Sequence, residues 1–371
     1  MDALARTPPH DLHVELGARM VPFAGHEMPV QYPDGVMAEH RHCREAAALF
    51  DVSHMGQARL TGEGRAAALE ALTPASVAGL ATGRQRYALL TDAAGGILDD
   101  FMVADQGEAL FLVVNAANRA ADIAHIRAHL PEGVALEVLE DRALLALQGP
   151  EAEAALAPIA PGAGDMRFMD AIAAESGFGT LWISRSGYTG EDGFEISVPA
   201  AKAEALARAL LAAPGVRPAG LGARDSLRLE AGLCLHGSDI DTGTSPVEAG
   251  LGWSIQKVRR RGGAREGGFP GAARILDELE SGAPRTRVGL RPEGRAPMRA
   301  GTALFAGEAG DEAIGTVTSG GFGPSVGAPI AMGYVASDHA APGTRLFGEV
   351  RGRRLPVTVA PLPFHPTAFK R

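Results

Sequence analysis

Two adjacent aspartates, Asp99 and Asp100, interrupt an apolar segment at residues 97–103 (ILDDFMV). Aspartate is depleted from β-strands, and a buried carboxylate must be paired or protonated. Successive strand residues point to opposite faces, so the pattern predicts that the two carboxylates do not act together as one pair. Two interpretations stay open: both side chains cap the turn at 95–96, or one lines a pocket and handles a proton or a positive charge.

The bulk composition indicates a globular chain of more than one domain. Its 371 residues exceed one ordinary core, which favours two or three domains. A hydrophobic content of 46% and a charged content of 21% are typical of soluble globular proteins. No apolar run reaches about 18 residues, so we expect no membrane span. The net charge of -9 argues against general nucleic-acid binding.

The cysteines and the N-terminal residues favour a cytoplasmic protein. Cys43 and Cys234 form no C-x-x-C pair, which indicates a reducing compartment without a disulfide or metal framework. The first residues lack the charged-then-apolar pattern of a signal peptide. His40, His42 and Cys43 are close in sequence, but such residues on a charged helix are more often solvated than metal ligands. We therefore expect no metal.

The hydrophobic periodicity and the turn residues predict an α+β fold with an all-β C-terminal region. Helices are expected at residues 36–49, 63–72, 118–130, 200–212, 221–233 and 271–280. Strands are expected at 57–60, 87–90, 97–103, 110–115, 134–139, 143–147, 180–184 and 194–198. From residue 287 onward, five short strands separated by Gly and Pro turns favour a small β-barrel or sandwich.

Positive charge is concentrated in the C-terminal third. Residues 251–371 hold 17 Lys and Arg against 10 Asp and Glu, a net charge of +7, although the whole chain is acidic. Arg259, Arg260 and Arg261 form a local cluster. We expect this region to meet an acidic partner; a solvated arginine surface is the alternative.

Eight short segments carry more information because they occur together and in a fixed order. They are FAGHEMP at 23–29, FDVSHMG at 50–56, GGILDD at 95–100, VVNAAN at 113–118, QGP at 148–150, GYTGEDGFE at 187–195, GLGARDSLRLE at 220–230 and TSGGFGPSVG at 318–327. With these segments the chain resembles, over nearly its whole length, the aminomethyltransferase (T protein) family of the glycine cleavage system.

The resemblance implies a three-domain cloverleaf around a central folate channel, with a C-terminal β-barrel. The first two domains would be α+β and would interleave segments of the chain. We expect the first domain to combine residues 1–50 with part of 135–282, and the second to combine 51–134 with part of 150–220. The barrel would occupy residues 283–371.

The resemblance also implies a reaction and its partners. A lipoyl arm on the H protein would carry an aminomethyl group, and the enzyme would release ammonia and pass the one-carbon unit to tetrahydrofolate, giving 5,10-methylenetetrahydrofolate. We expect a monomer with no nucleic-acid or membrane partner. Two alternatives stay open: a tetrahydrofolate-dependent demethylase of a sulfonium acid, and a non-catalytic folate-binding relative in iron–sulfur assembly.

By the family pattern, Asp100 is the catalytic carboxylate and Asp99 is structural. The resemblance assigns the pterin ring to Glu195, and it places Arg224 and Tyr188 at the folate site. Further contacts are implied for Asn115, Tyr87 and Met55.

Three residues depart from the family pattern. His236 stands where many relatives have Tyr, and His26 replaces a usual Trp. Phe369 falls where some relatives have a C-terminal Tyr that touches the substrate, so a hydroxyl group is missing at this contact. The Lys-Gly-Cys-Tyr motif of the iron–sulfur relatives is absent.

Overall fold

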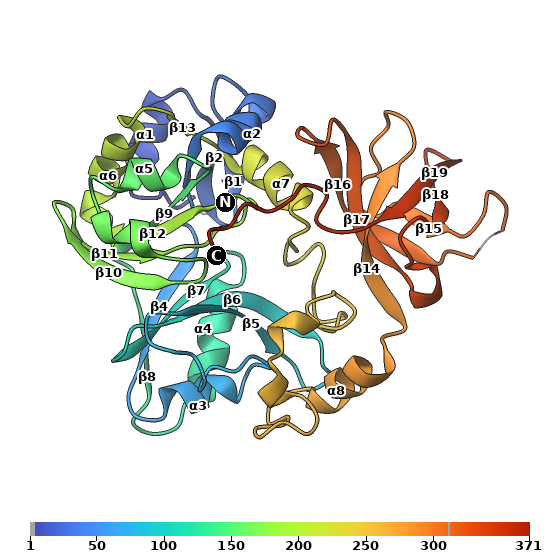
Figure 1. The fold of residues 1–371 in the computed structure, drawn as a ribbon, viewed down its shortest axis with the longest axis horizontal. Helices are drawn as coiled ribbons and strands as arrows, with labels where there is room; N and C mark the ends of the chain where they lie inside the picture. The colour runs from blue at the N-terminus through green and yellow to red at the C-terminus, as the bar shows by residue number, and fades with distance from the viewer. Residues whose placement is uncertain (1–3, 311) are drawn as a thin grey trace.

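The computed structural model describes residues 4–310 and 312–371, which form three lobes (Figure 1). Two lobes each hold a β-sheet with helices, and the third is a closed six-stranded barrel. The predicted α+β class with a C-terminal barrel is confirmed. Among the described residues, no helix combines the length and apolar character needed to cross a membrane.

The first lobe is built on a six-stranded sheet whose middle strands are almost entirely buried. Its strand order is β10 (Ala171–Ser176), β11 (Gly179–Ser184), β12 (Gly193–Pro199), β9 (Arg142–Gln148), β3 (Ala47–Asp51) and β13 (Val216–Pro218). A separate hairpin pairs β1 (Arg19–Phe23) with β2 (His26–Gln31). The helices in this part of the fold are α1 (His10–Glu15), α2 (Val36–Glu45), α5 (Ala152–Leu156), α6 (Ala203–Leu211) and α7 (Leu221–Glu230).

The second lobe is built on a five-stranded antiparallel sheet. Its strand order is β5 (Gln85–Thr91), β6 (Ile97–Asp105), β7 (Ala109–Val114), β4 (Gly56–Thr61) and β8 (Ala135–Val138). Its helices are α3 (Arg65–Glu70), α4 (Arg119–Ala128) and α8 (Ala272–Ser281). Strand β6 carries the aspartate pair, and its pairing with β7 begins directly after the pair, at Phe101 opposite Val114.

The third lobe is the barrel. Its strands close in the order β14 (Arg285–Pro292), β17 (Ala328–Ala336), β16 (Gly315–Gly323), β15 (Ala303–Phe305), β18 (Arg345–Val350) and β19 (Arg353–Ala360). Short 3₁₀ turns are Pro161–Asp165, Ala200–Lys202, Gly252–Ser254, Lys257–Arg259 and Ser337–His339.

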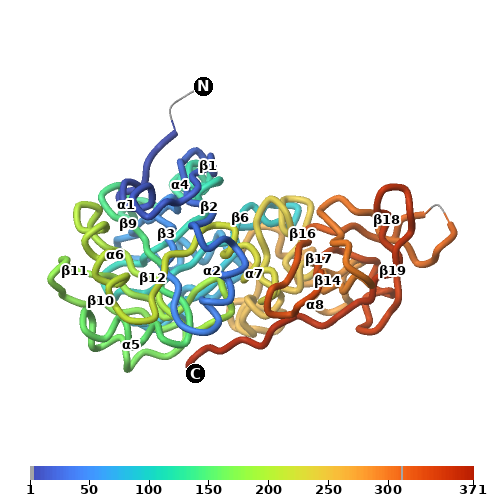
Figure 2. Tube along the Cα trace, turned by 90° about the horizontal axis from the view of Figure 1, so that it is seen from above, coloured from blue at the N-terminus to red at the C-terminus, as the bar shows by residue number. Residues whose placement is uncertain are grey.

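The chain crosses between lobes in two places. Ile240 and Leu251 pack against Leu89 and Ile97 of the second lobe, so part of the segment after α7 shares a core with an early sheet. The C-terminal segment leaves the barrel and runs back to the first lobe (Figures 1 and 2), where the N–H of Ala368 donates to the carbonyl of Gly190 (3.0 Å). The exact boundaries of the two interleaved domains stay a prediction.

The predicted helix at 36–49 is partly wrong. Helix α2 ends at Glu45, and residues 47–51 form β3 in the middle of the first sheet. The run AALFD is fully buried and pairs with β9 on one side and β13 on the other. Residues 47–51 therefore form a strand although their helix propensity is high, because they pair with two neighbours in a buried sheet. This is a tertiary effect that local sequence does not reveal.

The guanidinium groups of the arginine cluster at 259–261 have partners within the chain, and docking of an acidic partner on this region stays a prediction. Arg259 is 4% exposed and donates to the Glu70 carboxylate (3.2 Å) and the Glu70 carbonyl (3.1 Å). Arg260 donates to the carbonyls of Ile255 and Gly252. Arg261 pairs with exposed carboxylates on α8. All three guanidinium groups are engaged within the chain.

Candidate functional site

The aspartate pair lies beside an irregularity in β6. Leu90 of β5 is opposite Asp99, whereas Thr91 is opposite Ile97, so Leu98 is an extra residue in the ladder. Asp99 is fully buried and Asp100 is partly exposed, in keeping with the predicted alternation. Such bulges re-aim neighbouring side chains, and here one precedes the two carboxylates directly.

The two carboxylates nevertheless share a hydrogen-bond donor, and that they do not act together as one pair stays a prediction. The Nδ2 of Asn115 donates to Asp99 Oδ1 (2.8 Å) and to Asp100 Oδ1 (2.8 Å). Asn115 directly follows β7, the neighbour of β6, so its amide reaches both side chains at the end of the strand pair. The backbone N–H of Asp100 also donates to Asp99 Oδ1 (2.9 Å). One amide group therefore fixes the orientation of both carboxylates.

Asp100 is poised to change its charge near neutral pH. Burial and then the adjacent Asp99 raise its pKa to about 6, against the lowering effects of the Tyr87 hydroxyl, the Asn115 amide and His236. A carboxylate with this pKa can hold or release a proton near neutral pH. It can also stabilise a cation at little cost in solvent reorganisation.

An aromatic pair adjoins Asp100. Tyr87, on β5, stacks on Trp253 with ring centroids 5.4 Å apart and an interplanar angle of 28°. Trp253 is 61% exposed, an unusual position for the largest side chain. Trp253 was not predicted as a site residue, since a single tryptophan in a short 3₁₀ turn gives no sequence pattern.

Tyr188 and Arg224 form a second group beside the first. The Arg224 guanidinium lies over the Tyr188 ring, 4.8 Å from its centroid, and the Tyr188 hydroxyl donates to the carbonyl of Cys234. The Nη1 of Arg224 is buried with no hydrogen-bonding partner. An unpartnered guanidinium nitrogen is costly, so Arg224 is ready to bind an acceptor.

The loop that carries Tyr188 requires a glycine. A Cβ on Gly187 would lie 1.8 Å from Gln148 Oε1. Gln148 fixes the loop from both sides of Tyr188, because its Nε2 donates to the carbonyl of Ser186 (2.9 Å) and its Oε1 accepts from Thr189 Oγ1 (2.8 Å). The short motif around Tyr188 is thus held against the end of β9.

Glu195 lies on β12 and is 9% exposed. Burial raises the pKa of its carboxyl, and Arg224 opposes that rise. Glu195 and Arg224 each oppose the shift that burial imposes on the other's pKa, and both Arg224 and Asp100 affect the pKa of Tyr188. Helix α7, strands β12, β6 and β5, and the loop after β11 bring these groups together, although they are far apart in sequence.

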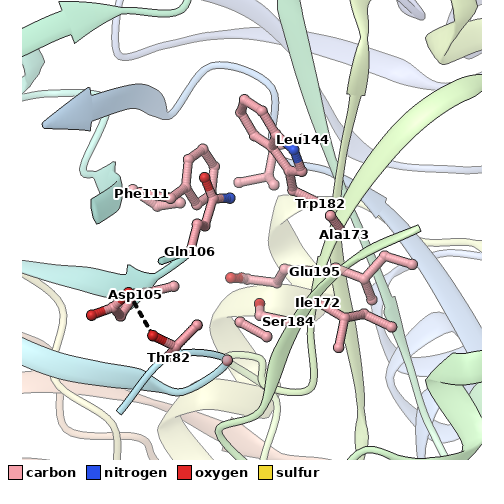
Figure 3. Close-up of a pocket in the computed structure, with 15 residues that line it drawn as sticks. Thr82, Asp105, Gln106, Phe111, Leu144, Ile172, Ala173, Trp182, Ser184 and Glu195 are labelled. Carbon is pink, nitrogen blue, oxygen red and sulfur yellow. Dashed lines mark hydrogen bonds between the residues drawn. The ribbon is translucent and has the colours of Figure 1, made fainter. Parts of the chain in front are cut away.

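A cavity of about 180 Å³ lies between the first two sheets (Figure 3). Phe111, Trp182 and Leu144 supply apolar walls, and Thr82, Asp105 and Ser184 supply polar atoms. Glu195 is the one predicted site residue that lines it. Asp100, Asn115, Tyr188 and Arg224 therefore lie outside this cavity.

The remaining predicted residues occupy other positions. Met55 packs against a core that includes Phe111 and Val113, next to the cavity walls. Phe369 stacks on Phe168, with ring centroids 4.1 Å apart, at the point where the C-terminal segment meets the first lobe.

The two histidines that depart from the family pattern also have defined partners. His236 Nδ1 lies 2.9 Å from Asn118 Nδ2 and 3.7 Å from Asp99 Oδ1, so this residue belongs to the aspartate neighbourhood. His26 lies at the β1–β2 turn, where its Nδ1 donates to the carbonyl of Ala24 (3.0 Å).

The histidines and cysteine of α2 take structural roles. His40 is fully buried and contacts Ser226, Glu230 and Ser325, which ties α2 to α7 and to the barrel. Cys43 donates to the carbonyl of Gln148 (3.5 Å). In the part of the chain that the structure describes, no three His, Cys, Asp or Glu side chains are grouped as metal ligands.

Comparisons with known proteins agree on one family. The GCVT N-terminal domain model matches residues 9–259, and the glycine cleavage T-protein C-terminal barrel domain model matches residues 285–365. The mitochondrial aminomethyltransferase of Dictyostelium discoideum is 43% identical over 99% of this chain and 94% of its own length. The human mitochondrial aminomethyltransferase is 45% identical over 99% and 92%, respectively.

These relatives overturn the prediction of a cytoplasmic protein, because those from Dictyostelium, human and Flaveria are all named mitochondrial enzymes. The prediction rested on two unpaired cysteines and on the first few residues. A reducing environment is not particular to one compartment, so the cysteines could not decide it.

A solved structure extends the similarity to the whole fold. The crystal structure of glycine cleavage system aminomethyltransferase T from Bartonella henselae is similar to this chain with a TM-score of 0.92 and 43% sequence identity, covering 100% of both chains. Together with the family models and the full-length relatives, this result shows that the chain belongs to the glycine cleavage T-protein family, the aminomethyltransferases.

Proposed function

We propose that this chain transfers the one-carbon unit of an aminomethyl group, carried on the lipoyl arm of an H protein, to tetrahydrofolate. Ammonia and 5,10-methylenetetrahydrofolate would be the products. The observation that carries the proposal is Asp100, partly exposed and with a raised pKa, beside the Tyr188–Arg224 pair. The full-length similarity to aminomethyltransferases does not favour the sulfonium demethylase or the iron–sulfur relative.

The chemistry requires a group such as Asp100. When ammonia leaves the S–CH2–NH2 group, the carbon becomes electron-poor and shares a positive charge with sulfur. When a folate nitrogen has bonded to this carbon and the C–S bond breaks, releasing the dihydrolipoyl thiol, the carbon becomes part of a folate iminium cation. An ionised carboxylate nearby stabilises this charge in a site of low dielectric constant. As the second C–N bond to folate forms, a folate nitrogen loses a proton, which the same carboxylate can accept. Asn115 would keep Asp100 oriented during both steps.

The folate would lie in a channel between the lobes, where Glu195 and Arg224 contribute opposite charges. The pterin ring presents adjacent N–H donors that one carboxylate can accept in bidentate fashion, a role we give to Glu195. Arg224 Nη1, unpartnered and buried, would bind an acceptor atom of the ligand. Tyr188 would contact the ring system. We expect apolar contacts from Tyr87 and Met55, and a contact from Phe369.

Replacing Glu195 with glutamine is expected to weaken tetrahydrofolate binding. The amide has one acceptor oxygen and one donor group, so it cannot accept the two N–H bonds in bidentate fashion. One lost charge-assisted pair costs about 1.5–3 kcal/mol, a fall in affinity of roughly 10- to 150-fold. Calorimetric titration with tetrahydrofolate measures this directly. Glu175→Gln, on the exposed side of edge strand β10 in the same sheet, is the matched control and should bind normally. Normal binding by Glu195→Gln would place the pterin elsewhere.

The turnover rate is expected to fall as the pH drops below about 6. Asp100 must be ionised to stabilise a cation or accept a proton, and its pKa is raised to about 6. Activity is therefore present above this pH and is lost on acidification, by roughly tenfold per pH unit. A kcat profile between pH 5 and 8, with the fold checked by circular dichroism, tests it. A rate that is flat down to pH 5 would show that Asp100 does not titrate as described.

The function itself is tested by product analysis. The purified chain is mixed with aminomethyl-loaded H protein and tetrahydrofolate, and 5,10-methylenetetrahydrofolate is quantified. A parallel reaction supplies a sulfonium acid in place of the H protein and looks for methyltetrahydrofolate. Product in the first reaction alone supports the proposal, and product in the second alone would favour the demethylase.

A further inference from the structure

A second buried acid adjoins the aspartate pair. Asp122, on the first turn of α4, is 3% exposed, and Asp99 is 0% exposed. The two carboxyl groups lie within hydrogen-bonding contact of one another. Asp99 Oδ2 and Asp122 Oδ2 are both buried, and neither has a donor from any other group in the described residues.

Asp99 and Asp122 cannot both be ionised in this buried contact. Like charges in contact in a low-dielectric interior repel strongly, so one proton is retained between them. Asp99 Oδ1 already accepts from the Asn115 amide and from the backbone N–H of Asp100, which favours the charge on Asp99. The proton then remains on Asp122. Burial, and after it the contact with Asp99, raises the pKa of Asp122 to about 9.

Within the described part of the chain, the groups that face Asp99 and Asp122 supply no positive charge from arginine or lysine that would favour ionisation of both carboxyl groups. On β6 the facing charged group is Asp100, which also raises the pKa of Asp122. From the segment after α7, His236 lies 3.7 Å from Asp99 Oδ1, and its Nδ1 contacts Asn118. From β7, Asn115 is uncharged. No arginine or lysine forms an ion pair with Asp99 or Asp122 among residues 4–310 and 312–371.

We propose that Asp122 is a positioning residue: its carboxylic acid O–H donates to Asp99, and this acid pair anchors Asn115, which in turn holds Asp100 in its working orientation. The proposal rests on the catalytic role given to Asp100 above. In this role Asp122 touches neither substrate nor folate, and it acts on Asp100 through Asp99 and Asn115. The series of contacts runs from Asp122 to Asp99, then to Asn115 and on to Asp100.

Two substitutions separate this role from simple packing. Asp122→Asn keeps a donor toward Asp99 without needing a proton, so kcat should stay within about threefold of the parent. Asp122→Leu has similar bulk but no donor, so it leaves Asp99 Oδ2 unpaired and should lower kcat by roughly 10- to 100-fold. The KM for tetrahydrofolate should change little in both variants, since the folate groups lie on other elements.

A measurement without turnover tests the shared proton. Carbon-13 NMR of labelled aspartate carboxyl groups at pH 7 should show one protonated carboxyl in the parent and none in Asp122→Asn. If Asp100 proves not to be catalytic, this signal persists while neither variant changes the rate, so the two failures are distinguishable. Absence of a protonated carboxyl in the parent would overturn the proposal, as would equal kcat losses in the Asn and Leu variants.

Discussion

Asp100→Asn is expected to lower turnover by about 10²–10⁴-fold while leaving tetrahydrofolate affinity nearly unchanged, the loss typical of a missing acid–base or charge-stabilising group. An amide can still meet the Asn115 side chain, but it carries no negative charge and accepts no proton. Glu195 and Arg224, which we assign to folate, lie on β12 and α7 rather than on β6. Steady-state kinetics and calorimetry on the same preparation measure the two quantities separately.

The matched control for this variant is Asp141→Asn. Asp141 is exposed and directly precedes β9, so the same chemical change there should leave turnover within error of the parent. A near-normal rate for Asp100→Asn would remove Asp100 from the mechanism. A large loss of folate affinity without a loss of turnover would instead make Asp100 a binding residue.

Arg259→Met is expected to lower the free energy of unfolding by about 3–5 kcal/mol, because it leaves the Glu70 carboxylate with less compensation in a buried site. Arg259 lies over the Phe269 ring, 5.3 Å from its centroid, and also donates to the carbonyl of Arg265 (3.0 Å). It joins the loop after the Trp253 turn to the end of α3. Denaturant unfolding measures the change.

Arg261→Met, two positions further along the chain, is the matched control for Arg259→Met. Arg261 is exposed and its partners Asp277 and Glu280 are exposed too, and such surface pairs contribute about 0–1 kcal/mol. Similar destabilisation by both variants would contradict the distinction between a buried and a surface arginine. Docking of an acidic H protein on the basic C-terminal third stays a prediction.

The sequence predicted the architecture better than its local details. Periodicity and turn residues located most strands of the barrel and of the second sheet, because their patterns are local. Strand β3 was hidden, since AALFD can form a helix or a buried strand and only its neighbours β9 and β13 decide. Likewise, nothing in a run of three arginines tells which one is buried; Glu70, far away in sequence, settles that for Arg259.

At the site, alternation along β6 separated a buried Asp99 from a partly exposed Asp100. It could not reveal the extra residue at Leu98 or the Asn115 amide that joins the two carboxylates. Family motifs supplied the names of the other site residues, but not their arrangement. The Asp122 contact and the Trp253–Tyr87 stack depend on α4 and on a distant loop, so only the folded chain reveals them.

The most direct test of the account is a single-turnover reaction in which ammonia and 5,10-methylenetetrahydrofolate are followed together. Aminomethyl-loaded H protein is mixed with excess enzyme, with and without tetrahydrofolate, for the parent and for Asp100→Asn. We expect the parent with tetrahydrofolate to release one ammonia for each methylenetetrahydrofolate, and Asp100→Asn to be slowed in both products by about 10²–10⁴-fold. Equal rates for the two proteins would contradict the account. So would ammonia release by the parent, in the presence of tetrahydrofolate, without formation of 5,10-methylenetetrahydrofolate.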